Sequence, residues 1–92
     1  MILSFGDAST ERLFEDHAVK RFQGFAARAK RKLEVIHAAA WLEDLAVPPS
    51  NRLEKLRGKL ANYYSIRIND QWRVIFKWTG TDAREVSIVD YH

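Results

Sequence analysis

The sequence ends in three side chains that can hold or move protons: Asp90, Tyr91 and His92. Histidine suits acid–base work near neutral pH, because the reference pKa of its side chain is ~6.5. The triplet directly continues the alternating apolar pattern of residues 86–89, so a strand would anchor it. In a regular strand, Asp90 and His92 point to one side and Tyr91 to the other. By composition alone, the tail is either a proton-handling site or an ordinary polar terminus.

A second chemical feature is an excess of positive charge in the C-terminal half. The chain has a formal net charge of +3, and residues 52–77 alone hold seven basic and two acidic side chains. Such an excess can neutralise a phosphate backbone, although a lysine- and arginine-rich solvated surface gives the same count. The seven cations are Arg52, Lys55, Arg57, Lys59, Arg67, Arg73 and Lys77.

Length and composition narrow the choice of chemistry. With 92 residues, the chain is expected to form one domain over residues 1–92. It is too short to hold a second, dinucleotide-binding domain. It has no cysteine, and His17, His37 and His92 lack metal-ligand spacing, so we expect neither a metal site nor a cofactor. No segment has the length of a membrane helix or the form of a signal peptide, which favours a cytoplasmic protein without membrane contact.

The N-terminal half reads as helical. Asp7, Ser9 or Thr10 could cap a short helix over residues 11–15. From Phe25 onward, apolar residues recur every three or four positions and predict a long helix that runs to about Leu45. The two prolines at 48 and 49 end it. We expect Trp41 to lie in the core. The solvent side of this helix carries Arg28, Arg31 and Lys32, which would suit an acidic partner.

After the prolines the apolar period changes to two. The pattern predicts antiparallel strands over residues 64–68, 72–78 and 86–89, with possible short edge strands at 53–56 and 2–5. The fold class is therefore α+β, with N-terminal helices packed on an antiparallel sheet. Strand parity places Trp72 and Trp78 toward the core. The same parity puts Arg67, Arg73 and Lys77 together on the other face, as an open basic surface.

Several stretches, taken together, resemble the HigB branch of the RelE/ParE toxin superfamily, the toxins of bacterial type II toxin–antitoxin modules. They are N-R-L-E-K-L-R-G at 51–58, Y-S-I-R-I-N-D-Q-W-R-V-I-F at 64–76 and the terminal D-Y-H. The start M-I-L-S-F and the stretch 10–14 are similar too. The resemblance covers essentially the whole chain and implies a small RelE-like fold.

The resemblance also implies an activity: metal-independent, ribosome-dependent cleavage of mRNA. It further implies a helix-turn-helix antitoxin of the HigA type, with operator DNA bound only through that antitoxin. Within the resemblance, Asp90, Tyr91 and His92 match the catalytic terminal triplet, and Arg73 would stabilise the scissile phosphate. Arg57 would contact RNA. The wider set of residues expected to bind RNA is Lys55, Arg57, Lys59, Arg67 and Lys77.

One position departs from the family pattern. Some relatives carry a catalytic histidine in an L-H-P-L segment, where this chain reads Leu53, Glu54, Lys55 and Leu56. Either Glu54 is the general base, or that role rests with His92. Two other functions remain open at this point: a ParE-type toxin that poisons DNA gyrase without cleaving RNA, and a degenerate RNA-binding module.

Overall fold

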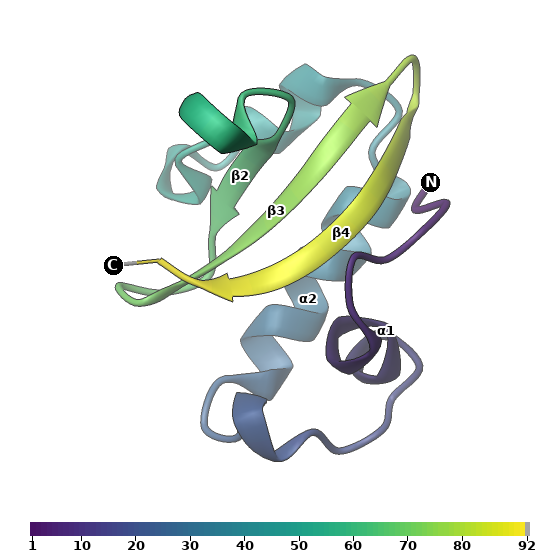
Figure 1. Ribbon diagram of the computed structural model, residues 1–92, viewed down its shortest axis with the longest axis vertical. Helices are drawn as coiled ribbons and strands as arrows, with labels where there is room; N and C mark the ends of the chain where they lie inside the picture. Colours follow the sequence, from purple (N-terminus) through teal and green to yellow (C-terminus); the bar gives the residue numbers. More distant parts are fainter. Residues whose placement is uncertain (92) are drawn as a thin grey trace.

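The computed structural model describes residues 1–91, so His92 lies outside the described residues. Two helices, α1 (Ala8–Phe14) and α2 (Ala26–Ala38), precede a four-stranded sheet. Figure 1 shows α2 crossing one face of that sheet. The strands are β1 (Glu54–Lys55), β2 (Tyr64–Arg67), β3 (Trp72–Thr79) and β4 (Asp82–Asp90). They lie in chain order and every neighbouring pair is antiparallel, which confirms the predicted α+β class.

The core forms where α2 meets the sheet. Ala29, Leu33 and Ile36, one helical turn apart, are fully buried, as the 3.6-residue period requires. The sheet contributes alternate residues of its central strands, among them Val74 and Phe76. Partly buried Trp72 and Trp78 pack against this cluster, so their predicted place at the core is confirmed.

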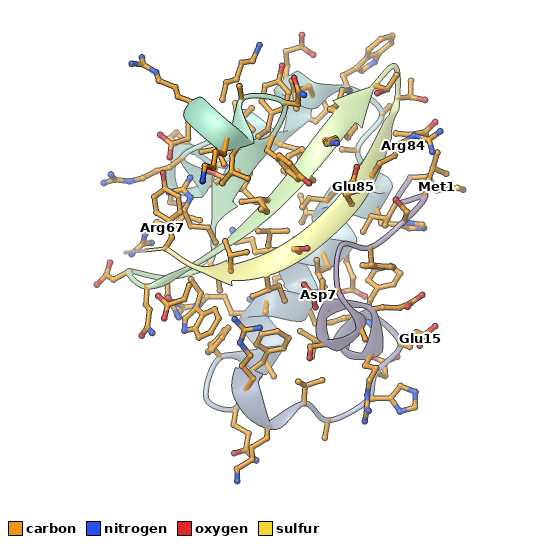
Figure 2. The ribbon with its side chains drawn as sticks, in the orientation of Figure 1. Met1, Asp7, Glu15, Arg67, Arg84 and Glu85 are labelled. Atoms are coloured by element: carbon orange, nitrogen blue, oxygen red, sulfur yellow. The ribbon has the colours of Figure 1, made fainter. Side chains whose placement is uncertain are left out.

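The N-terminal segment is tied to β4. Of the three cap candidates it is Asp7 that caps α1, accepting a hydrogen bond from the Thr10 backbone N–H at 2.7 Å (Figure 2). The buried Thr10 hydroxyl in turn accepts from the Ile88 backbone N–H at 2.9 Å. The expected edge strand at 2–5 is present as two isolated parallel bridges, from Ile2 and Phe5 to β4.

Two predictions for the segment after α2 are wrong. The helix ends at Ala38, because Ala39 turns to an extended conformation, and a separate 3₁₀ turn covers Leu42–Ala46. This path buries Ala39 and Leu45, so tertiary packing overrides the helical propensity of the segment. Trp41 is the N-cap that precedes this 3₁₀ turn, and it is 63% exposed rather than in the core. Within residues 1–91, no helix is long and apolar enough to cross a membrane.

The C-terminal end of β4 is held against the turn between β2 and β3. In that turn, the Asn69 side-chain oxygen accepts from the backbone N–H groups of Gln71 and Trp72, at 2.9 and 2.8 Å. The Tyr91 backbone N–H donates to the Gln71 carbonyl at 2.7 Å, and the Gln71 amide donates to the Asp90 carboxylate at 3.0 Å. Asp90 and Tyr91 are therefore anchored by the sheet, as the sequence predicts.

Candidate active site

Arg73 lies at the centre of the arrangement that can do chemistry. It sits on β3 directly opposite Arg67 of β2, and only 8% of its surface is exposed. Its Nε donates to the Ser65 hydroxyl at 2.9 Å, and its Nη2 donates to the Arg52 carbonyl at 2.7 Å. A buried guanidinium with these bonds is held rigidly, since its fork of donors has a fixed geometry.

One nitrogen of Arg73 remains for a ligand. Within residues 1–91, Nη1 makes no hydrogen bond, whereas every fully buried side-chain nitrogen or oxygen does. Nη1 therefore reaches solvent. Beside the guanidinium, a Glu54 carboxylate oxygen lies 3.6 Å from Nη2, and the Tyr91 ring centre lies 5.2 Å from the guanidinium carbon. An anchored cation is thus flanked by a carboxylate and a phenol.

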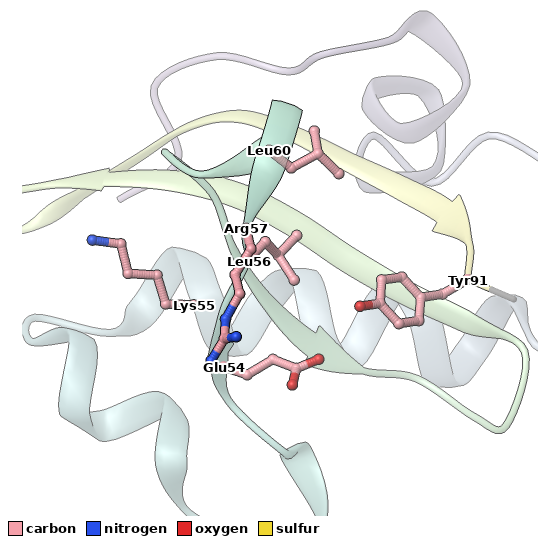
Figure 3. Close-up of a pocket in the computed structure, with 6 residues that line it drawn as sticks. All are labelled: Glu54, Lys55, Leu56, Arg57, Leu60 and Tyr91. Atoms are coloured by element: carbon pink, nitrogen blue, oxygen red, sulfur yellow. The ribbon is translucent and has the colours of Figure 1, made fainter.

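Two surface hollows meet at Tyr91. Figure 3 shows the first, of about 530 Å³, across which the Tyr91 hydroxyl points from the end of β4 toward β1. It is lined by Glu54, Lys55, Leu56, Arg57, Leu60 and Tyr91. The second, of about 240 Å³, is lined by Arg52, Arg67, Asn69, Asp70, Arg73 and Tyr91. Both are shallow and cationic, and they suit an extended anion better than a small molecule enclosed in a pocket.

The structure brings most of the predicted site residues together. Lys55, Arg57 and Glu54 line the first hollow, and Arg67 and Arg73 line the second. Arg67 also pairs with the Asp70 carboxylate in the β2–β3 turn.

The remaining predicted site residues lie elsewhere or face another way. Asp90 pairs with Trp72 in the sheet register, so it faces the side opposite Tyr91, as strand alternation predicts. Lys59 is exposed on a 3₁₀ turn, Gly58–Leu60, and lines neither hollow. His92 lies outside the described residues.

Lys77 lies on the same sheet face as Arg73 but four residues further along β3, roughly 13 Å away at 3.3 Å per residue. Its ammonium nitrogen is 2.8 Å from the Glu85 carboxylate and 5.3 Å from the centre of the Tyr63 ring. The hydrogen bond to Glu85 raises the pKa of Lys77, and the bonds from Lys77 and Tyr63 lower the pKa of Glu85. Burial and the bond to Glu85 raise the pKa of Tyr63. The predicted basic surface is therefore divided, and its Lys77 end is neutralised.

Two groups that hold Arg73 are absent from the predicted site. The Ser65 hydroxyl could have been found from strand parity, since Ser65 shares the polar face with Arg73. The Arg52 carbonyl could not. Its position depends on the left-handed backbone of Arg52, with φ of 47°, and an arginine does not signal that conformation as a glycine or asparagine at the same position would.

The described residues offer cations and proton-handling groups rather than a metal centre. Within residues 1–91, no three histidine, aspartate or glutamate side chains gather as metal ligands. The arrangement can hold a phosphate at Arg73 and place Glu54 and Tyr91 beside it, as acid–base chemistry at a phosphodiester requires.

Comparisons with known proteins give a consistent answer. Residues 3–92 match the family model described as the RelE-like toxin of type II toxin–antitoxin system HigB. Toxin HigB-1 of Vibrio cholerae is 41% identical over 80 residues, covering 85% of this chain and 84% of the relative.

The solved structures show the same fold. YafQ from Escherichia coli BL21(DE3) superposes with a TM-score of 0.68 at 18% identity, over 98% of this chain and 91% of YafQ. The chain from the YoeB–YefM toxin–antitoxin complex of Staphylococcus aureus gives 0.57 at 24% identity, over 100% of this chain and 95% of the other.

Proposed function

This chain belongs to the HigB-like family of RelE-like toxins from type II toxin–antitoxin systems, and on that premise we propose that it is a ribosome-dependent endoribonuclease that cleaves mRNA and inhibits translation. The observation that carries the proposal is the state of Arg73. Its guanidinium is buried, anchored and flanked by Glu54 and Tyr91, yet Nη1 remains available. This is the arrangement expected of a group that binds a reacting phosphate.

The reaction proposed for this site uses the RNA's own nucleophile. The 2′-oxygen attacks the adjacent phosphorus, and the bond from phosphorus to the 5′-oxygen breaks. The products are a 2′,3′-cyclic phosphate and a free 5′-hydroxyl. A base must take the 2′-hydroxyl proton and an acid must supply one to the leaving oxygen. Arg73 stabilises the charge that develops on the phosphate. Glu54 or His92 serves as base, and the Tyr91 hydroxyl supplies the proton to the leaving 5′-oxygen. Asp90 faces the other side of the strand and holds the end of β4 through Gln71. A guanidinium supplies the positive charge, so this mechanism is metal-independent.

The ribosome is proposed to position the message. In-line attack requires three atoms to be aligned, and positioning of that kind supplies ~7–11 kcal/mol. The two hollows are shallow and offer few side chains to hold bases. RNA bound in the decoding site would already have its backbone held, so the toxin need only add charge and proton transfer. Lys55, Arg57, Lys59, Arg67 and Lys77 would contact message or ribosomal RNA.

The proposed partner is a helix-turn-helix antitoxin of the HigA type. The family belongs to toxin–antitoxin systems, and the YoeB–YefM structure is a complex of a toxin with its antitoxin. The antitoxin would neutralise this protein and would be its link to operator DNA. A toxin that acts on translating ribosomes works in the cytoplasm.

The experiment is mapping of mRNA ends, with and without programmed ribosomes. We expect growth arrest on expression without the antitoxin, cleavage only of ribosome-bound message, and 5′-hydroxyl ends. Equal cleavage of free and bound RNA would contradict ribosome dependence. Arrest with intact mRNA and damaged DNA would instead identify a gyrase poison. RNA binding without arrest or cleavage would identify a degenerate binding module.

A further inference from the structure

A second cationic cluster lies on α2, away from Arg73. It consists of Arg28, Arg31 and Lys32, which occupy one side of the helix. Lys30, within the same stretch, points elsewhere, to the Asp16 carboxylate at 2.7 Å and the Phe14 carbonyl at 2.5 Å. Within residues 1–91, no carboxylate lies within ion-pair distance of the three clustered cations.

The cluster is unfavourable for the helix itself. Arg28 and Arg31 are three residues apart, and Arg28 and Lys32 are four, so their like charges repel on one face. Arg28 also lies in the first turn of α2, where the helix dipole disfavours a cation. Burial lowers the pKa of Lys32, and the charges of Arg28, Arg31 and Arg67 lower it further. Lys32 has a packing role, because its ammonium donates to the Asn51 side-chain oxygen. Within residues 1–91, no hydrogen bond or ion pair explains in the same way why Arg28 and Arg31 lie beside it.

The cluster is continuous with the candidate active site. Arg28 and Arg31 line two neighbouring hollows, of about 540 and 340 Å³. The smaller one is also lined by Lys32 and Arg67. Arg67 in turn lines the hollow that contains Arg73. Within residues 1–91, these three hollows are lined by one carboxylate, Asp70, which pairs with Arg67.

We propose that α2 carries a second RNA-binding surface, at which Arg28, Arg31 and Lys32 hold phosphates of the same RNA strand that Arg73 binds. The proposal rests on the proposed function, in that RNA is the substrate. Arg67 connects the two surfaces, since it lies opposite Arg73 in the sheet and beside Lys32 in the smaller hollow.

A nucleic-acid backbone fits this surface better than the acidic partner that it would suit on sequence alone. Protein interfaces rely on buried apolar or aromatic anchors at their centre. In the smaller hollow the apolar lining residue is Ile68, which is only 2% exposed. Apolar side chains do line the larger hollow, namely Phe25, Ala26 and Ala27. In the smaller hollow, four cations without an exposed apolar centre suit the phosphates that repeat along one strand.

The test measures binding to RNA that cannot be cleaved. RNA with 2′-O-methyl groups throughout lacks the attacking hydroxyl, so its binding is independent of any nuclease activity. The variant is Arg28→Gln with Arg31→Gln. The matched control is Arg12→Gln with Lys20→Gln. It removes the same charge from exposed positions that line none of the three hollows. Fluorescence anisotropy with a trimer and a dodecamer, each over a salt series, gives affinities and salt slopes.

For the dodecamer, we expect the variant to lower the salt slope of log affinity by about 1.4, since each phosphate contact to a single strand contributes ~0.7. The trimer, held at Arg73, should lose little affinity, and the control variant should behave as wild type. Equal losses for trimer and dodecamer, equal slopes in variant and control, or no dodecamer binding by wild type at low salt would each overturn the proposal.

Two further arms identify the source of the anion. Weaker antitoxin binding by the variant, with RNA binding unchanged, would assign the surface to an acidic protein. The second arm measures cleavage by the variant on programmed ribosomes, with messages that end near the decoding site and with longer ones. An equal loss of cleavage for both lengths would mean that the α2 surface binds ribosomal RNA. Both results would overturn the proposal. If the wild-type protein bound the dodecamer as expected but did not cleave ribosome-bound mRNA, that result would contradict only the proposed function.

Discussion

The two ends of β3 each assemble a cation, a carboxylate and a phenol, and they do so differently. At one end Arg73 lies with Glu54 and Tyr91. At the other, Lys77 lies with Glu85 and Tyr63. The cation lies at nearly the same distance from the ring centre in both cases, 5.2 and 5.3 Å. In composition alone, the two clusters differ by an arginine in place of a lysine.

Their hydrogen bonds separate them. The Lys77 cluster is closed, because Glu85 accepts from Lys77 at 2.8 Å and from the Tyr63 hydroxyl at 3.2 Å. In the Arg73 cluster, the ion pair with Glu54 is looser, at 3.6 Å and beyond hydrogen-bond distance, and the anchoring comes from Ser65 and a backbone carbonyl. A carboxylate that already neutralises its cation competes with a phosphate. We infer that openness, rather than residue type, distinguishes a site from a structural cluster.

The largest expected effect is that of Arg73→Ala. Loss of one group that stabilises a developing anion costs on the order of 10²–10³ in rate, measured as single-turnover cleavage on programmed ribosomes. Lys77→Ala should cost less than about tenfold, since its charge is already paired and the contribution is to RNA affinity alone. Equal losses in the two variants would remove the distinction between the ends of β3.

Arg73→Ala also affects the fold, contrary to what its place on the polar face implies. The variant leaves the Ser65 hydroxyl and the Arg52 carbonyl without their donor, which costs roughly 1–3 kcal/mol for buried groups. Cleavage should therefore be compared at a temperature where melting curves show both proteins folded. Arg73→Lys, which keeps the charge but loses the fork of donors, serves as a second variant.

Sequence predicts this site in part, and the reason lies in periodicity. Strand alternation places Arg73, Arg67 and Lys77 on one face and Tyr91 with them, because side-chain direction follows from parity. Strand alternation does not say which residues face each other on neighbouring strands, so it does not predict that Glu85 neutralises Lys77. The path from Ala39 to Arg52 was also beyond prediction, since burial of Leu45 and Asn51, not propensity, determines it.

The second prediction concerns the general base. If Glu54 takes the proton, Glu54→Gln should lower the rate by about 10²-fold or more, the usual range for general base catalysis. If His92 does, His92→Ala should show that loss and Glu54→Gln a smaller one. Cleavage rates measured across pH identify the base. The rate rises with pH as the base loses its proton, and the variant that lacks the base also lacks this rise on the acidic side of the pH–rate profile. Near wild-type rates in both variants would exclude both residues.

The third prediction separates the Tyr91 hydroxyl from its ring. Tyr91→Phe keeps the ring beside Arg73 and removes only the hydroxyl that points across the larger hollow (Figure 3). If the hydroxyl transfers a proton, cleavage should fall by about tenfold or more. The corresponding variant at the closed cluster, Tyr63→Phe, removes one bond to Glu85 and should leave cleavage within about twofold. Unchanged cleavage in Tyr91→Phe would limit Tyr91 to stacking on the guanidinium.

The smallest effect is expected at Glu85, and it concerns stability rather than cleavage. The bonds from Lys77 and Tyr63 lower the pKa of this carboxyl in the folded protein. A carboxyl with a lowered pKa contributes stability above its ordinary pKa, and that contribution is lost as the pH falls through the lowered value. The melting temperature of wild type should therefore exceed that of Glu85→Gln by a small margin at neutral pH, and the margin should shrink in acid. If the difference in melting temperature persisted at low pH, Glu85 would act through packing. The Lys77 cluster would then owe its stability to contacts other than its ion pair.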